Sequence, residues 1–107
     1  MSVLAVNDSG FKSQLEENNM VVVKYFAEWC GSCKLLAPKF NRLSNDERYK
    51  GIKFLEANAE TCQEARKAAG VDNLPFFAIF KKGELIKGIA TAKEEGIEAL
   101  LQDFIQA

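Results

Sequence analysis

Two cysteines, Cys30 and Cys33, are separated by two residues in the segment Trp29-Cys-Gly-Ser-Cys-Lys34. Such a C-x-x-C pair can form a redox-active disulfide, supply half of a zinc site, or be two unrelated thiols. A zinc site needs two further ligands, and the chain has one other cysteine, Cys62, and no histidine. The lack of histidine also excludes Ser-His-Asp and Cys-His catalytic pairs. The residue types therefore favour a redox disulfide without a metal.

The pair lies between a strand and a helix. The run from Met20 to Ala27 is β-branched, aromatic and nearly uninterrupted, which is typical of a central strand buried on both faces. From Gly31 to about Glu47, apolar residues recur at helical spacing, and Pro38 within this run is expected to kink the helix. A cysteine at this junction faces unpaired backbone N–H groups and the positive end of the helix dipole, which stabilise its thiolate.

This position gives the two sulfurs different roles. Lowering a cysteine pKa from about 8.5 to about 7 corresponds to roughly 2 kcal/mol of preferential thiolate stabilisation. Cys30 is therefore expected to be the nucleophile near neutral pH. Cys33, one turn further along the helix, is expected to be more shielded and to resolve the mixed disulfide that Cys30 forms.

The remaining patterns describe one α/β domain over residues 1–107. Further strands are expected at 2–5, 52–59 and 76–80, and Lys82-Gly83 is expected to turn the chain into an antiparallel hairpin through Leu85-Ile86. Further helices are expected after the capping residue Asn7, between Cys62 and Ala69, and in the amphipathic stretch Ile97–Ile105. The order β-α-β-α-β-α-β-β-α predicts a central mixed β-sheet flanked by helices on both faces.

Composition and charge exclude several kinds of partner. The 107 residues carry 14 Lys and Arg against 15 Asp and Glu, a formal charge of -1, and these charges are dispersed along the sequence. Nucleic-acid binding is therefore not expected. No apolar run reaches the roughly 18 residues of a membrane helix, and the first residues lack the features of a secretory signal. A cytoplasmic monomer that does not bind membranes is expected, although a cleaved prepeptide before this sequence stays open.

Several motifs resemble those of the thioredoxin family. Trp29-Cys-Gly-Ser-Cys-Lys34 differs at one residue from the thioredoxin signature W-C-G-P-C-K, and Pro38, Leu74-Pro75 and the runs 23–28 and 80–84 match their family counterparts. The resemblance spans essentially the whole chain and implies the thioredoxin fold. It also implies reversible dithiol-disulfide exchange with protein disulfides as substrates, a thioredoxin reductase or equivalent as electron donor, and no cofactor besides the Cys30–Cys33 disulfide.

The same resemblance implies a substrate-binding surface around the disulfide, formed by Trp29, Gly31, Ser32, Leu74, Pro75 and Thr91. Pro75 is expected to be cis and to lie against the disulfide, since a cis bond is accessible before proline. Leu74 is expected to offer its backbone N–H and C=O to an extended substrate strand. Trp29 either contacts substrate or caps the core.

Two departures from the family concern the redox chemistry. Ser32 replaces the signature proline, so the pair is expected to be more oxidising than a typical thioredoxin; serine can equally be an ordinary residue of a helix's first turn. Lys24 stands where the family usually has a buried aspartate that assists proton transfer to the resolving cysteine. Because an unpaired buried ammonium is costly, and Glu56 stands where many thioredoxins have a lysine, we predict a charge-swapped Lys24–Glu56 pair. Glu56 or neutral Lys24 is then the base near Cys33, unless Lys24 reaches the surface and has no catalytic part.

Other positions carry weaker expectations. Phe76 and Thr91 replace a threonine and a glycine that are common in the family near the substrate groove, and they are expected to alter partner choice, or, for Phe76, to pack in the core. Cys62 is expected to be a buried inert thiol, with oxidation or an intermolecular disulfide as the alternative. Glu28 and Lys34 are expected to be solvated charges.

These observations predict a thiol-disulfide oxidoreductase that reduces protein disulfides. Two alternatives stay open. One is a thioredoxin-fold adaptor that binds a partner with little redox turnover, although retention of both cysteines argues against it. The other is an iron-sulfur cluster held between two subunits by Cys30 and other thiols.

Overall fold

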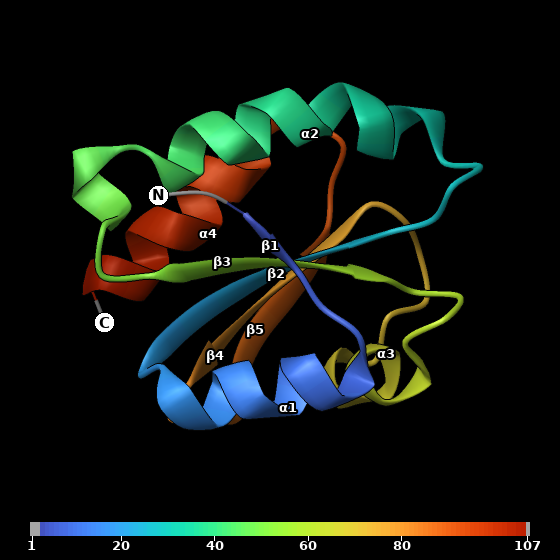
Figure 1. Cartoon of the computed structure of the whole chain (residues 1–107). Helices are drawn as coiled ribbons and strands as arrows, with labels where there is room; N and C mark the ends of the chain where they lie inside the picture. Colours follow the sequence, from blue (N-terminus) through green and yellow to red (C-terminus); the bar gives the residue numbers. More distant parts are fainter. Residues whose placement is uncertain (1–2, 107) are drawn as a thin grey trace.

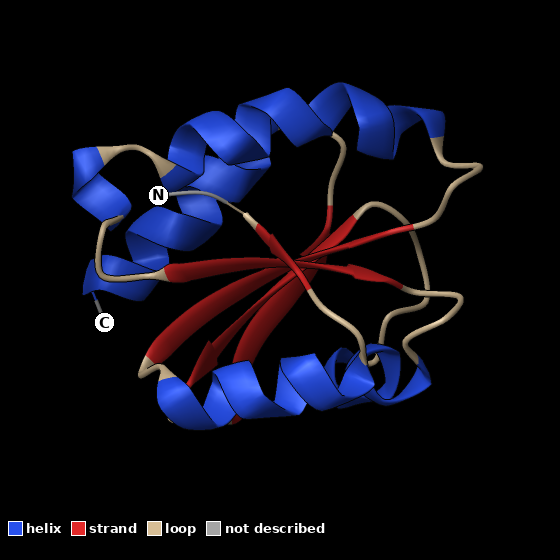
Figure 2. Ribbon diagram, viewed as in Figure 1, coloured by secondary structure: helices blue, strands red, loops and turns tan. Residues whose placement is uncertain are grey.

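The computed structural model describes residues 3–106. Strands and helices alternate and are followed by a hairpin and a last helix, in the predicted order (Figures 1 and 2). In chain order the elements are β1 (Leu4–Ala5), α1 (Asp8–Glu17), β2 (Met20–Phe26), α2 (Gly31–Ser44), a 3-10 helix (Glu47–Tyr49), β3 (Lys53–Asn58), α3 (Gln63–Ala69), β4 (Phe76–Lys81), β5 (Glu84–Ala90) and α4 (Glu94–Gln106).

The strands form one mixed sheet in the order β1-β3-β2-β4-β5. Strands β1, β3 and β2 are parallel, while β4 runs antiparallel to both β2 and β5. Helices α2 and α4 cover one face of the sheet, and α1 and α3 cover the other (Figure 1). The predicted sandwich of a mixed sheet between helices is therefore confirmed.

Alternate residues of β2 point to opposite faces of the sheet, as the pleat of a strand requires. Val21, Val23 and Tyr25 pack with residues of α1 and α3, whereas Val22 packs with residues of α2 and α4. All residues from Val21 to Tyr25 are buried, and β2 has a partner strand on each edge. The prediction of a central buried strand is confirmed, and this strand leads directly to the C-x-x-C motif.

The second helix ends earlier than its apolar pattern predicts. It stops at Ser44 instead of near Glu47, and the side chain of Asp46 accepts a hydrogen bond from the Arg48 N–H at 2.9 Å to start the 3-10 helix. Short polar side chains of this kind offer the backbone an alternative to continued α-helix. Pro38 lies inside α2, and the kink expected there stays a prediction.

Two further features, the edge strand and the hairpin turn, agree with the sequence patterns. The edge strand is present at Leu4–Ala5, paired with β3, while Ser2 lies outside the described residues. The hairpin turn has positive φ at Lys82 (52°) and Gly83 (83°), the left-handed pair that suits a two-residue hairpin and explains the glycine.

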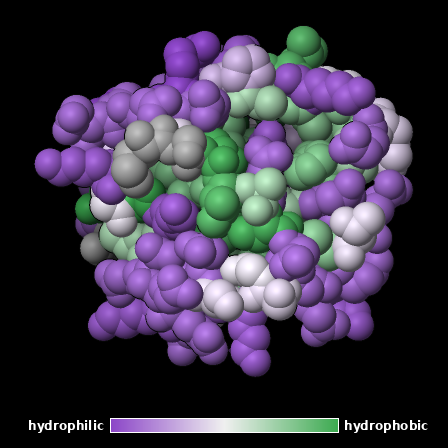
Figure 3. All heavy atoms as spheres, viewed as in Figure 1, coloured by the Kyte–Doolittle hydropathy of each residue, from purple (hydrophilic) through white to green (hydrophobic). Residues whose placement is uncertain are grey.

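In the view of Figure 3, polar side chains surround a smaller apolar area over β1, where Leu4 is exposed.

Candidate active site

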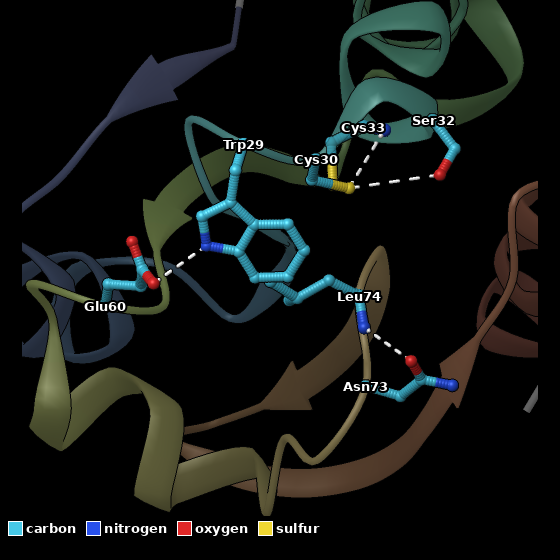
Figure 4. The surroundings of a disulfide bond; sticks show 7 residues. All are labelled: Trp29, Cys30, Ser32, Cys33, Glu60, Asn73 and Leu74. Carbon is cyan, nitrogen blue, oxygen red and sulfur yellow. Dashed lines mark hydrogen bonds between the residues drawn. A yellow bond between two sulfur atoms is a disulfide. The ribbon is translucent and has the colours of Figure 1, made fainter.

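The cysteine pair lies at the start of α2, where the predicted strand-to-helix junction places it. Cys30 is the N-cap residue of α2, and its Sγ accepts a hydrogen bond from the Cys33 backbone N–H at 3.2 Å. The two residues are joined by a disulfide, their Cα atoms are 5.3 Å apart, and both side chains are buried (Figure 4). The sulfur of Cys30 thus occupies the point at which unpaired helix N–H groups favour a negative charge.

Ser32 adds a hydroxyl beside this sulfur. Its Oγ lies 3.9 Å from the Sγ of Cys30, on the first turn of α2 (Figure 4). Ser32 also retains a backbone N–H that a proline would lack. The hydroxyl is positioned to interact with a Cys30 thiolate, so the effect of Ser32 on the redox pair stays a prediction with a structural basis.

The segment before β4 also contacts the disulfide region. The Leu74–Pro75 peptide is cis, as the resemblance implies, and Leu74 packs against the cluster of Ala27, Cys30 and Cys33. The Leu74 N–H, which was expected to be open to substrate, donates to Oδ1 of the adjacent Asn73 at 3.0 Å (Figure 4). A substrate strand that uses this donor must therefore displace the Asn73 side chain.

Trp29 lies outside the core, which rules out its alternative role as a core cap. The side chain is 69% exposed, and its Nε1–H donates to Oε2 of Glu60 at 2.8 Å (Figure 4). Glu60 is held in turn at the end of β3, where its N–H donates to the Asn58 side chain at 2.9 Å. This hydrogen bond holds the indole of Trp29, the residue that precedes Cys30. Contact between the indole and substrate stays a prediction.

The predicted pair of Lys24 and Glu56 is present. These residues are direct partners in the parallel register of β2 and β3, and Nζ of Lys24 lies 3.9 Å from Oε1 of Glu56. The Lys24 side chain is 5% exposed and that of Glu56 is 31% exposed, so Lys24 does not reach the surface. Burial lowers the pKa of Lys24 below its ordinary value, and the nearby carboxylate of Glu56 opposes that shift.

The pair shares a cavity with the resolving cysteine. A cavity of about 170 Å³ lies between β2, β3 and α2, and its lining includes Lys24, Glu56, Cys33, Glu28 and Lys34. This volume and its charged walls suit several water molecules. Glu28 and Lys34 are exposed, as expected of solvated charges, but they also border this cavity, which the sequence did not indicate.

Phe76 packs in the core, and Thr91 is hydrogen-bonded to its chain neighbours and to Pro75. Phe76 is buried with its ring 6.1 Å from that of Tyr25, and it fills the space above Gly88, where an added Cβ would approach the Phe76 ring to 2.7 Å. Core packing is therefore the structural role of Phe76. The Thr91 Oγ1 accepts from the Lys93 N–H at 3.1 Å at the start of α4. The Thr91 backbone N–H still donates to the carbonyl of Pro75, at 3.2 Å, so its part in substrate binding stays a prediction.

Cys62 lies on the far face of the sheet from the disulfide. It is buried and unpaired, and its Sγ–H donates to the Val6 carbonyl at 3.5 Å. Cys62 is the N-cap residue of α3 but makes no capping hydrogen bond. The carboxylate of Asp8, in α1, performs this function by accepting from the N–H groups of Glu64 (3.2 Å) and Ala65 (3.0 Å). The expected buried thiol is present, and its oxidation stays a prediction.

Sequence reasoning missed two residues of the site. It also did not note Leu35, which is 74% exposed on α2, although its position off the helical stripe formed by Leu36, Phe40 and Leu43 was an available signal. Glu60 and Asn73 had no local signal, since their roles depend on partners that the fold brings to them. Within the described part of the chain, no cluster of three or more His, Cys, Asp or Glu side chains is arranged to hold a metal ion. None of the helices in residues 3–106 has the length and hydropathy to span a membrane.

A disulfide on the first turn of a helix, packed against the leucine of a cis Leu-Pro peptide and preceded by a central buried strand, defines a dithiol-disulfide exchange protein. The thioredoxin family model matches residues 2–105. Thioredoxin-1 of Schizosaccharomyces pombe is 39% identical over 101 residues, which cover 94% of this chain and 96% of that protein. Thioredoxin of Homo sapiens is 35% identical over 88 residues, or 82% of each chain. A thioredoxin structure from Plasmodium falciparum has a TM-score of 0.87 at 26% identity and covers 95% of this chain and 99% of its own. The chain belongs to the thioredoxin family, has the thioredoxin fold, and is a thiol-disulfide oxidoreductase.

Proposed function

We propose that the protein reduces disulfide bonds of other proteins, with Cys30 attacking and Cys33 resolving. The observation that carries this proposal is the position of the Cys30 sulfur at the N-terminus of α2, within 3.2 Å of the Cys33 N–H. That donor and the helix dipole stabilise the thiolate, which is the attacking species in thiol-disulfide exchange.

The reaction has two balanced steps. The Cys30 thiolate attacks one substrate sulfur, so that a mixed disulfide forms and the other substrate sulfur leaves as a thiolate. Cys33 then loses its proton and attacks the Cys30 sulfur, which forms the Cys30–Cys33 disulfide and releases the second substrate sulfur as a thiolate. The two electrons come from the dithiol of the protein, and no bound cofactor takes part.

A reductase must then return two electrons to the oxidised pair, and we propose a thioredoxin reductase or an equivalent enzyme as the donor. Support comes from a similar chain in the crystal structure of a ferredoxin:thioredoxin reductase and thioredoxin f2 complex, with a TM-score of 0.86 and 28% identity. We further propose that the protein works as a cytoplasmic monomer in cellular redox homeostasis. The formal charge of -1 is dispersed along the sequence, so we propose no nucleic-acid partner for the protein.

Substrates are proposed to bind over the exposed face of the motif. Trp29, fixed by Glu60, offers an exposed indole, and Gly31 and Ser32 leave the first turn of α2 open beside the disulfide. Across the disulfide, the backbone of Leu74 and the buried ring of Pro75 supply the edge along which an extended segment can lie, with Thr91 hydrogen-bonded behind Pro75.

Insulin reduction with dithiothreitol as the electron source tests the function. We expect rapid turnover by the native protein and only the slow background rate of dithiothreitol with Cys30→Ser. When dithiothreitol is absent, we expect reduced Cys33→Ser to accumulate a mixed disulfide with insulin. An adaptor with little redox activity would instead give the native protein the same slow rate as Cys30→Ser. That result would overturn the proposal. Gel filtration and absorbance after anaerobic purification test the monomer against a dimer that holds an iron-sulfur cluster.

A further inference from the structure

The most buried charged side chain that shares the cavity with the resolving cysteine is a lysine. Among the described residues, the titratable groups that line the cavity next to Cys33 are Lys24 from β2, Glu56 from β3, Glu28 from the loop after β2 and Lys34 from α2. Glu28 and Lys34 are exposed, and Glu56 is 31% exposed, whereas the side chain of Lys24 is only 5% exposed. Solvent therefore screens the other three charges more than it screens Lys24.

Three neighbours favour the protonated form of Lys24. The carboxylate of Glu56 lies 3.9 Å from Nζ. The rings of Phe26 and Phe40 lie with their centroids 5.6 Å and 5.8 Å from Nζ, within the range in which an aromatic face attracts a cation. Burial acts in the opposite direction, but it does so in a cavity large enough for water, so Nζ is not in a dry environment.

We propose that Lys24 acts as a permanent ammonium that stabilises the Cys33 thiolate during resolution, and not as the base that removes the Cys33 proton. This inference rests on the proposed function, because it concerns the second step of that reaction. Lys24 is a positioning residue here: it acts through the field that it creates at Cys33. The proton leaves Cys33 through the cavity toward Glu56 and solvent, and the electron pair that remains on sulfur forms the new bond to Cys30.

The proposal predicts a specific change in the pH profile. A unit charge across a hydrated cavity of this size shifts a pKa by on the order of one unit, which is a tenfold change in the thiolate fraction below the pKa. Thiolate nucleophilicity rises with pKa with a coefficient of about 0.4–0.5, so one unit makes the thiolate itself about threefold more reactive. At neutral pH, removal of the charge lowers the thiolate fraction about tenfold and raises thiolate reactivity about threefold, so resolution should slow about threefold. At high pH the thiol is fully ionised with or without the charge, so resolution should become about threefold faster.

Rapid mixing of the reduced protein with Ellman's reagent isolates this step. The first equivalent of dye is released when Cys30 attacks, at a rate that depends on reagent concentration. The second is released when Cys33 attacks the mixed disulfide, at a rate that does not. The pH dependence of this second phase reports the pKa of Cys33.

We expect Lys24→Met to raise the midpoint of this profile by on the order of one pH unit, with the crossover in rate described above. Lys24→Arg keeps a positive charge but cannot accept a proton near neutral pH, and we expect it to keep the native midpoint. Lys34→Met removes an exposed charge from the same cavity and serves as the matched control, with an unchanged midpoint.

Two outcomes would overturn the inference. An unshifted midpoint in Lys24→Met would mean that the ammonium has no effect on Cys33. A Lys24→Arg variant that folds, as shown by an unchanged first phase, but resolves as slowly as Lys24→Met would mean that Lys24 accepts the proton. In both of these outcomes the first phase and insulin reduction are still observed. Failure of the proposed function is a different result, because the first phase itself would then be missing, and both the proposed function and this inference would be wrong.

Discussion

Replacing Ser32 by proline should make the redox pair more reducing. The backbone can accept the change, because Ser32 is in the first turn of α2, where N–H groups have no helical partner. A proline crowds the Cβ of the residue before it, but that residue is Gly31, which has no Cβ. The substitution therefore removes the Ser32 hydroxyl beside Cys30, together with the Ser32 backbone N–H, without an expected cost in packing.

The size of the effect follows from the contacts of the Cys30 sulfur. The Cys33 N–H at 3.2 Å remains in the variant, while the Ser32 hydroxyl at 3.9 Å is lost. A hydrogen bond to a charged group contributes about 1.5–3 kcal/mol, and we take about 1 kcal/mol for this long contact to sulfur. That corresponds to about 0.7 unit in the Cys30 pKa. For a two-electron couple it lowers the reduction potential by about 20 mV.

Equilibration with glutathione buffers, followed by acid quenching and alkylation, measures the potential, and the pH dependence of iodoacetamide alkylation measures the Cys30 pKa. Ser32→Ala removes the hydroxyl but keeps the N–H, so it separates the two contributions. We expect the reduction potential to be highest in the native protein, lower in Ser32→Ala, and lowest in Ser32→Pro, where it should be near the thioredoxin value of about -270 mV. A native potential already at that value, or a rise in Ser32→Pro, would refute the reasoning.

Three further substitutions test other parts of the structure. Gly88→Ala places a Cβ 2.7 Å from the Phe76 ring; it should lower the free energy of unfolding by about 1–3 kcal/mol in urea titrations, and less so in a Phe76→Val background. Lys24→Met should be more stable than the native protein at pH 7, because burial lowers the folded-state pKa of Lys24. Between that lowered pKa and the ordinary value of 10.5, the unfolded native chain binds more protons than the folded one. The native protein therefore gains stability as the pH rises through this range, and the advantage of Lys24→Met should shrink. Asn73→Ala, which frees the Leu74 N–H, should lower the KM for insulin about two- to fivefold, as loss of a competing hydrogen bond of about 0.5–1 kcal/mol requires, and leave the Cys30 alkylation rate unchanged.

Much of the fold and the centre of the site could be predicted from sequence because the signals are local. The buried strand Met20–Phe26, the helix that starts at Gly31 and the hairpin at Lys82-Gly83 each follow from residue types within one element. The Lys24–Glu56 pair is a different case. The cost of an isolated buried ammonium demanded a partner, and the resemblance to a family indicated where that partner stands.

The rest of the site depends on distant segments. Glu60 reaches Trp29 across 31 positions of sequence, and neither residue carries a pattern that names the other. Core packing of Phe76 was one of the two roles predicted for it, but its partners, Gly88 and Tyr25, could not be named from the sequence. The cavity beside Cys33 is a property of how β2, β3 and α2 pack together, and no run of residues encodes an unfilled volume. The end of α2 was missed for a local reason, because the Asp46 cap ends the helix at Ser44 although the pattern predicted helix to about Glu47.

The carboxylate of Asp8 joins the first turn of α3 to α1, across 56 and 57 positions of sequence. The start of α3 therefore cannot fray unless α1 moves as well, and amide protons of these two helices should exchange with solvent in one opening event. The disulfide lies at the start of α2, which covers the opposite face of the sheet. Breathing of the α1 and α3 layer can then take place while the redox centre keeps its geometry.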